Sequence, residues 1–303
     1  MKRTYPLSID DQRTLPTGYD GPVYVWDIDK TYLATAFSSM KGMARIPIEF
    51  AIDKRAIPGM PEVLRGLRRG PGPTFACAPL YFVSASPPQL RRVVEHKMLL
   101  DGVEHDGITF KDWLGVMRQL SPRRFKEQVG FKLCALLAGR ERRPQSTEYL
   151  FGDDVERDAE AFHLYARLIG GLLSAGEAEA AMKAAGVHRE DRRCVRDLLD
   201  RIPPPRGRVA RIFIHLENDS PPSRFDRFRE LVTPVKGAYQ LALALLELGL
   251  LDAACARQVG EAVRTGHRPG QDLQALCADA VERGLVSGEK ARSAGPGYLT
   301  PRE

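Results

Sequence analysis

Two aspartates separated by one residue are the first feature of the chain that could carry out chemistry. Asp27 and Asp29 belong to the sequence DIDKT, which continues the run PVYVWD at residues 22–27. This run lacks polar–apolar alternation, which predicts a strand buried on both faces. Because ligands meet the carboxyl ends of strands in an open parallel sheet, we expect both carboxylates to face one pocket. One can attack a phosphorus atom and become an aspartyl phosphate while the other donates a proton to the leaving oxygen, and the pair also suits Mg²⁺.

A serine and a lysine follow in the order that this chemistry requires. Ser84 ends a second apolar run, LYFVS at residues 80–84, and we expect its hydroxyl to hydrogen-bond a phosphoryl oxygen. Lys132 lies in GFKLCALL on a predicted helix, where its ammonium group could neutralise the phosphoryl group and the aspartate. Lys126, six residues earlier, is the alternative for this role.

Acidic residues follow a third apolar run, EYLF at residues 148–151. They are Asp153, Asp154 and Asp158 in GDDVERD. Acidic side chains are also favourable at the start of a helix, which is predicted near residue 155, but two adjacent aspartates are more than one cap requires. We therefore expect Asp153 to complete the Mg²⁺ shell together with the DxD pair, because the metal compensates the repulsion among these acids.

Strand and helix patterns alternate along the first half of the chain. Strand patterns at residues 22–27, 80–84, 107–110 and 148–151 are separated by helical patterns. This alternation predicts a parallel sheet with crossover helices, an α/β fold. A helical insert is expected at about residues 171–206.

For the remaining segments, only secondary structure is predicted. The first twenty residues are expected to be irregular, residues 209–216 to return as a strand, and the chain beyond Pro222 to form helices only. Ser86 is expected to cap a helix through RRVVEHKMLL. A further helix is predicted over residues 124–137, with Gly139 after its end.

Composition narrows the class of ligand. Five scattered cysteines without a CxxC pair, and six histidines without HxH or HExxH spacing, argue against a disulfide framework and a zinc site. The net charge is +6, and residues 51–150 hold 17 Lys/Arg against 10 Asp/Glu. This basic region favours anionic ligands such as phosphate esters or acidic lipid headgroups. Nucleic acid is not specially favoured, because no aromatic-rich basic stripe accompanies the charge.

Apolar segments suitable for targeting or anchoring are not evident in the sequence. The N-terminal MKRTYPLSIDDQRT has no apolar run behind its basic residues. The longest apolar stretch, residues 241–251, contains Glu247 and is too short to span a bilayer. We therefore expect a cytoplasmic location. If acidic lipid headgroups are the ligand, the protein would act peripherally at membranes.

Four short sequences, which carry the acids, the serine and the lysine, together resemble the motifs of a known superfamily. DIDKT, YFVSAS, GFKL and FGDDVERD resemble the four motifs of the haloacid dehalogenase superfamily. More narrowly, PGMPEVLRGL, YFVSASPPQLRRVVEHKMLLDGV, ITFKDW and GDDVERDAEAF look like the catalytic domain of the actin-patch phosphatidate phosphatases. That family is related to the lipins and to the lipid-binding lipin-like domains of phosphatidylinositol-transfer proteins. The resemblance covers residues 22–170, with residues 209–216 matching the later strand.

The resemblance implies a Rossmann-like fold and a role for each motif residue. By this resemblance, Asp27 is the nucleophile and Asp29 is the acid/base. Ser84 is the motif-two hydroxyl, Lys132 is the motif-three lysine and Asp153 is a metal ligand. Asp158 occupies the second acidic position of the fourth motif, and Asp154 a place often held by a small residue. Thr31 completes the DxDxT form, and Lys30 replaces the acidic residue frequent in the lipid-phosphatase branch.

Little sequence remains for a cap domain over the site. About fifty residues separate the first motif from the second strand, and part of them is assigned to the PGMPEVLRGL helix. A minimal cap predicts an open site, as needed for a lipid headgroup at a membrane surface, a protein or a polynucleotide end.

The prediction as a whole is a Mg²⁺-dependent phosphatase of the α/β class. Residues 1–216 are expected to form the phosphatase domain and residues 217–303 a helical C-terminal extension. The expected reaction is phosphomonoester hydrolysis through an aspartyl phosphate, with phosphatidate or a related anionic phospholipid as substrate. Two alternatives are a non-catalytic lipid-binding or scaffold module and a phosphatase that acts on protein or polynucleotide ends.

Overall fold

A seven-stranded sheet forms the centre of the protein. The computed structural model describes residues 5–34, 54–118, 128–266 and 272–295. The strand order is β1-β4-β3-β2-β5-β6-β7. The strands are β1 (Leu7–Asp11), β2 (Pro22–Asp27), β3 (Leu80–Ser84), β4 (Gly107–Lys111), β5 (Thr147–Asp153), β6 (Arg208–His215) and β7 (Val232–Val235). All neighbours run parallel except β1, which is antiparallel to β4, so the predicted α/β fold with a Rossmann-like sheet is confirmed.

Alternate side chains of the strands enter two separate cores, as the pleat of a strand requires. In β2, Val23 and Val25 pack into one core, whereas Tyr24 and Trp26 pack into the other. The indole ring of Trp26 stacks on Phe151 of β5 at 4.1 Å, and Phe151 stacks on Phe213 of β6 at 5.2 Å. This aromatic row fixes three adjacent strands against one another just below their carboxyl ends.

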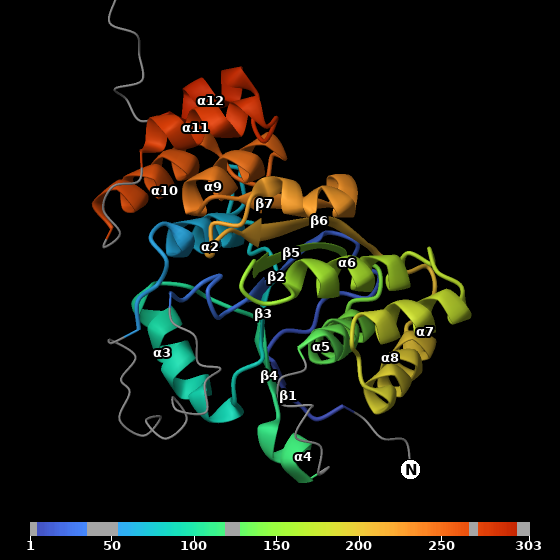
Figure 1. Cartoon of the computed structure of the whole chain (residues 1–303). Coiled ribbons are helices and arrows are strands. Elements are labelled where there is room, and N and C mark those ends of the chain that lie inside the picture. The colour runs from blue at the N-terminus through green and yellow to red at the C-terminus, as the bar shows by residue number, and fades with distance from the viewer. Residues whose placement is uncertain (1–4, 35–53, 119–127, 267–271, 296–303) are drawn as a thin grey trace, which may run out of the picture.

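One face of the sheet is covered by helices from two separate parts of the chain, residues 60–100 and 238–294. They are α2 (Met60–Arg69), α3 (Arg91–Leu100), α9 (Ala238–Glu247), α10 (Ala253–Thr265), α11 (Leu273–Glu282) and α12 (Gly288–Ala294). Their apolar residues share one core with Trp26 and Phe82 of the sheet. Figure 1 shows the C-terminal helices, orange to red, stacked beyond this face.

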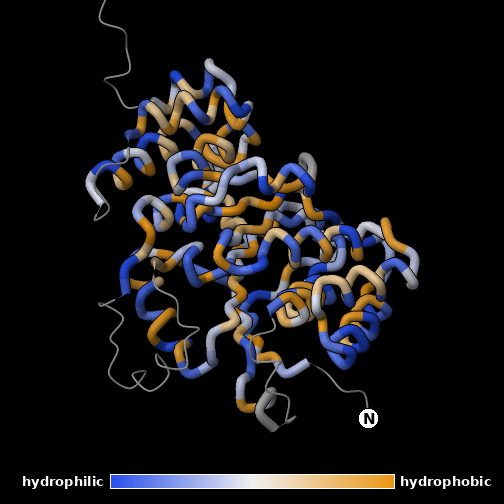
Figure 2. Tube along the Cα trace, viewed as in Figure 1, coloured by the Kyte–Doolittle hydropathy of each residue, from blue (hydrophilic) through white to orange (hydrophobic). Residues whose placement is uncertain are grey.

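The other face is covered by α5 (Val129–Arg142) and α6 (Asp158–Ile169). The predicted helical insert forms α7 (Ala175–Ala184) and α8 (Arg189–Arg201), which lie outside these two helices (Figure 1). Figure 2 shows apolar residues gathered in the strands at the centre of the molecule and the hydrophilic α8 at its periphery. Within the described residues, no helix combines the length and apolar character needed to cross a bilayer.

Both edge strands of the sheet depart from the sequence prediction. β1 lies in the lead that was expected to be irregular, and β7 lies where helices only were expected. Pro234 argues against a strand because it cannot donate to a ladder, but it is tolerated in β7 because that strand pairs with β6 alone. The sheet therefore includes a strand from beyond residue 216, and the domain boundary placed there stays a prediction.

Two helix boundaries also differ from prediction. α5 continues to Arg142, through Gly139. Beyond the glycine, Arg140 is buried in an ion pair with Glu148, which holds this last turn against β5. Residues 124–127, where this helix was expected to start, lie outside the described residues. Ser86 does not cap a helix, since α3 begins at Arg91 after a short 3₁₀ turn over Pro88–Leu90. Most of the segment predicted to form a minimal cap, residues 35–53, also lies outside the described residues.

Candidate active site at the carboxyl ends of the strands

Three predicted site residues end neighbouring strands. Asp27 ends β2, Ser84 ends β3 and Asp153 ends β5, and these strands are adjacent and parallel in the order β3-β2-β5. Asp29 and Thr31 follow β2 in a turn whose Tyr32 and Leu33 amides donate to the carbonyl of Ile28. All five side chains are buried. The structure therefore brings together the residues that the sequence places at strand ends.

Lys132 contacts the acidic cluster from α5. Its Nζ lies 3.0 Å from Asp27 Oδ1 and 2.8 Å from Glu156 Oε2, and it also donates to Asp158 Oδ1. The lysine is 1% exposed, so these ion pairs are screened little by water. Lys132 thus lies beside Asp27, and its role as the motif-three lysine stays a prediction. The alternative, Lys126, lies outside the described residues.

Burial governs the protonation of this cluster. Burial raises the pKa of Asp27 well above its usual value, an effect that Lys132 opposes and that the carboxylates of Asp158 and Glu156 reinforce. Burial alone would lower the pKa of Lys132, but the carboxylates of Asp158, Asp27 and Glu156 outweigh it and raise that pKa. The lysine is therefore charged, whereas the carboxylates repel one another.

Asp29 is held by two serine hydroxyls. Ser86 Oγ donates to Asp29 Oδ2 at 2.8 Å and Ser84 Oγ donates to the same oxygen at 3.2 Å. Ser84 Oγ also accepts from the Ser86 amide at 3.1 Å, which links the two serines. The hydroxyl of Ser84 thus fixes Asp29 in this structure, and its predicted contact with a phosphoryl oxygen stays a prediction.

The three predicted acids after β5 have different partners. Asp153 Oδ1 accepts from the amides of Val155 and Glu156 at 2.6 and 2.8 Å, which shapes the loop into α6. Asp154 accepts from the amides of Asn218 and Ser220 at 2.8 and 3.1 Å, so its carboxylate fixes the turn after β6.

Asp158 joins Lys132 to β5. Its Oδ2 accepts from the Asp153 amide at 3.2 Å, while Oδ1 accepts from Lys132. A Cβ at Gly152 would lie 2.6 Å from the Asp158 Cβ, closer than two non-bonded carbon atoms can approach. Glycine at this position is therefore what allows Asp158 to lie against the strand.

The donor set fits a divalent cation. Asp27 Oδ2 and Asp153 Oδ2 are buried and accept no hydrogen bond within the described part of the chain, and the same holds for the Thr31 hydroxyl. Buried oxygens of this kind normally have partners, and carboxylate oxygens are the ligands that Mg²⁺ prefers. A second possible grouping, Asp27, Glu156 and Asp158, has ligand atoms within 4.8 Å of one another. Those three already surround Lys132, whereas Asp153 Oδ2 has no partner within the described residues.

The comparison with protein families agrees with this arrangement. Residues 23–172 match the family model described as phosphatidate phosphatase APP1, catalytic domain. This segment is therefore similar to the APP1 catalytic domain. The chain is thus a phosphatase, and the resemblance found in the sequence over residues 22–170 is confirmed. Comparisons of the chain with curated proteins and with solved structures found no match.

Two residues of the candidate site escaped the sequence prediction. Glu156, which binds Lys132, lies in the GDDVERD motif. The sequence analysis assigned it only to the predicted helix that starts near residue 155. Ser86 was assigned to a helix cap. The spacing of Ser84 and Ser86 could have revealed the second serine, because alternate residues of an extended chain point to the same side.

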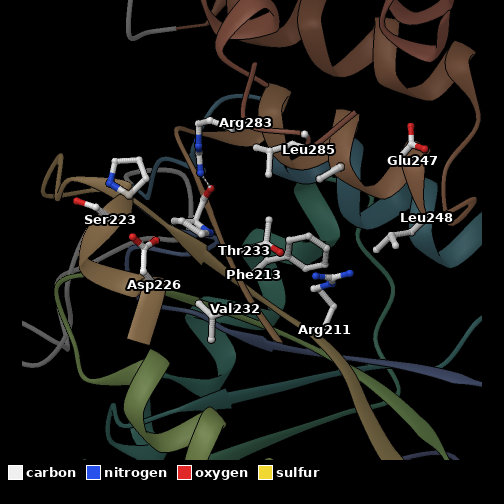
Figure 3. A pocket seen from close by; sticks show the side chains of 14 residues that line it. Arg211, Phe213, Ser223, Asp226, Val232, Thr233, Glu247, Leu248, Arg283 and Leu285 are labelled. Atoms are coloured by element: carbon white, nitrogen blue, oxygen red, sulfur yellow. Dashed lines mark hydrogen bonds between the residues drawn. The ribbon is translucent and has the colours of Figure 1, made fainter. Parts of the chain in front are cut away.

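A separate pocket of the phosphatase lies away from these residues. It has a volume of about 590 Å³ and is formed by β6, β7, α9, the α11–α12 corner and η5 (Pro222–Leu231). Figure 3 shows Phe213 and Thr233 beneath Arg283 and Leu285 in this pocket. The guanidinium of Arg283 donates to the Pro234 carbonyl and to Asp279. No predicted site residue lines this pocket.

Proposed function

We propose that the protein hydrolyses phosphatidate, or a related anionic phospholipid, in a Mg²⁺-dependent reaction through an aspartyl phosphate on Asp27. The observation that carries this proposal is the orientation of the buried Asp27 carboxylate. Oδ1 is 3.0 Å from Lys132 Nζ, whereas Oδ2 has no hydrogen-bond partner in the described residues. One oxygen is thus anchored and the other is available to attack.

In the first step, Asp27 Oδ2 forms a bond to phosphorus as the bond between phosphorus and the ester oxygen breaks. Asp29 gives its proton to the leaving oxygen, which departs as an alcohol. Ser84 and Ser86 support this role, because their hydroxyls hold the Asp29 carboxyl group in one orientation. Lys132 keeps Asp27 in place and offsets negative charge that develops on the phosphoryl group.

In the second step, water attacks the aspartyl phosphate and Asp29 accepts its proton. The bond between phosphorus and Asp27 Oδ2 breaks, which releases inorganic phosphate and restores the carboxylate. Asp29 thus alternates between acid and base, and its protonated form is regenerated by the same water molecule.

A magnesium ion would be held by Asp27 and Asp153, with Asp29 as the third predicted ligand. When bound, it supplies positive charge that stabilises the ionised nucleophile and the transferring phosphoryl group. The raised pKa of Asp27 supports this requirement, because the carboxyl group must lose its proton before it can attack. Among the described residues, Lys132 is the cation that contacts Asp27, Glu156 and Asp158, and one positive charge does not balance three carboxylates.

A comparison of substrates tests the proposed function. Phosphate release is measured from phosphatidate in phosphatidylcholine vesicles, from phosphopeptides, from phosphorylated nucleic-acid ends and from a soluble sugar phosphate, each with Mg²⁺ and with EDTA. We expect phosphatidate to give the highest kcat/KM and EDTA to stop the reaction. Vesicle binding without phosphate release would instead identify a lipid-binding module, and a strong preference for the sugar phosphate would contradict an open lipid site.

The stability of the metal-free protein should depend on pH in a characteristic direction. Burial, with the negative charge of Asp158, raises the pKa of Asp153 to about 8 despite Lys132. Burial, opposed by Lys132 and reinforced by Glu156, raises the pKa of Asp158 to about 6. Both carboxyls titrate near about 4 in an unfolded chain. The folded state therefore binds more protons, and its free energy of unfolding should fall as pH rises from about 4 to about 8.

Urea unfolding at several pH values, in EDTA and in excess MgCl₂, measures this effect. Mg²⁺ should stabilise the protein most at the upper end of the range, where the carboxylates are ionised. For the Asp153→Asn variant in EDTA, the free energy of unfolding should fall less steeply as pH rises. Mg²⁺ should also raise this free energy less than it does in the wild type. A wild-type stability that rises with pH in EDTA over this range would contradict the assignment.

A further inference from the structure

The turn that carries Asp29 contains a strained residue. Lys30 has a φ of 64°, a left-handed backbone conformation that residues other than glycine rarely adopt. Its amide donates to the Leu33 carbonyl at 2.7 Å, so the strain lies within a closed turn. Such a conformation costs on the order of 1–3 kcal/mol and persists only where surrounding contacts hold it.

One of those contacts comes from the end of β6. His215 Nδ1 lies 2.9 Å from the carbonyl oxygen of Lys30. A carbonyl oxygen only accepts hydrogen bonds, so Nδ1 carries a proton and donates. The imidazole is 6% exposed, and Glu217 Oε2 is farther away, at 3.9 Å from Nδ1.

This hydrogen bond spans a neighbouring strand. In the sheet, β5 lies between β2 and β6 (Figure 1). The hydrogen bond from His215 to Lys30 therefore joins the ends of two strands that are not neighbours. His215 is paired in register with Asp153, and its carbonyl accepts from the Asp154 amide at 3.0 Å. Beneath it, the row of Trp26, Phe151 and Phe213 fixes the spacing of the same three strands. One residue therefore connects both acidic loops of the site.

We infer that His215 is a positioning residue, which holds the DIDKT turn so that Asp27 and Asp29 keep their relative orientation while Asp153 is fixed from the same strand end. The kinetic part of this inference rests on the proposed function, whereas the structural part does not. His215 acts through its hydrogen bond to the backbone carbonyl of Lys30.

The kinetic test compares His215→Ala with His215→Asn. The alanine variant should lose about 10- to 100-fold in kcat, since small displacements of reacting groups are costly, with KM within about twofold of the wild type. The asparagine variant should recover most of kcat, because its side-chain amide can donate from a position close to that of Nδ1. His96→Ala, at an exposed histidine of α3, is the matched control and should behave as wild type.

Amide hydrogen exchange tests the inference without relying on activity. In His215→Ala, the amides of Lys30, Tyr32 and Leu33 should exchange faster by about tenfold, while residues 209–213 of β6 keep their protection. In His215→Asn the turn should be protected again. Unchanged exchange of the turn in the alanine variant would overturn the inference, as would an asparagine variant as impaired as alanine. A wild type without phosphatase activity would refute the proposed function, and the exchange data would still decide the role of His215.

Discussion

Replacement of Asp27 by Asn is expected to lower kcat for phosphate release by at least about 1,000-fold. The amide nitrogen and oxygen of Asn occupy the volume of the carboxylate, but neither can form the acyl phosphate bond of the intermediate. The variant should fold normally, and its Tm should be equal to or above that of the wild type. This follows because the ionised carboxylate is unfavourable at this buried position, as its raised pKa indicates.

Release of inorganic phosphate from p-nitrophenyl phosphate with Mg²⁺ measures the effect, and differential scanning calorimetry measures Tm. Asp20→Asn, at an exposed aspartate before β2, is the matched control and should leave both values unchanged. Trapping of radiolabelled phosphate on the wild type, but not on Asp27→Asn, would support the covalent intermediate. Undiminished turnover by Asp27→Asn would refute the nucleophile assignment.

Replacement of Lys132 by Met is expected to impair both activity and stability. The side chain keeps a similar length, but Asp27, Glu156 and Asp158 lose the cation that contacts them. Loss of one partner from a buried ion pair costs about 3–5 kcal/mol in free energy of unfolding. Loss of one electrostatic contact to the transferring group should lower kcat by about 100- to 1,000-fold.

The pH dependence separates this loss from simple loss of packing. Protonation of the carboxylates removes the repulsion that Lys132 offsets, so the stability defect of Lys132→Met should shrink as pH is lowered toward about 5. Urea unfolding across pH measures it, with Lys183→Met, at an exposed lysine of α7, as the control. A defect of equal size at all pH values would show that Lys132 contributes packing and not charge.

The parts of the fold that sequence predicted are those determined by local patterns. β2, β3, β4 and β5 are short apolar runs buried on both faces, and each was recognised from its composition alone. β1 is only partly buried and β7 is short, and both were missed because their composition does not resemble that of a central strand. LSIDD carries three polar residues and VTPV carries a proline, so neither run has the apolar character of a central strand.

The candidate site also has residues that local patterns predict and contacts that they do not. Asp27, Asp29, Ser84 and Asp153 could be proposed because each lies within two residues of a strand end, and parallel strands present those ends at one edge. Lys132 required the four motifs in order. Their tertiary neighbours could not be proposed, because contacts between side chains of different elements depend on register and helix placement, which no local pattern encodes.

The sequence by itself determined the reaction class, since a DxD pair at a strand end, followed by a serine, a lysine and further acids, leaves few other chemistries. The tertiary structure decided which atoms are anchored and which are available. It places Lys132 on Asp27 Oδ1 and Ser86 on Asp29, it uses Asp154 for a turn, and it brings His215 to Lys30 across 185 positions of the chain. The physical reason is that burial makes each unpaired polar atom costly, so the packed fold assigns partners that the linear order does not show.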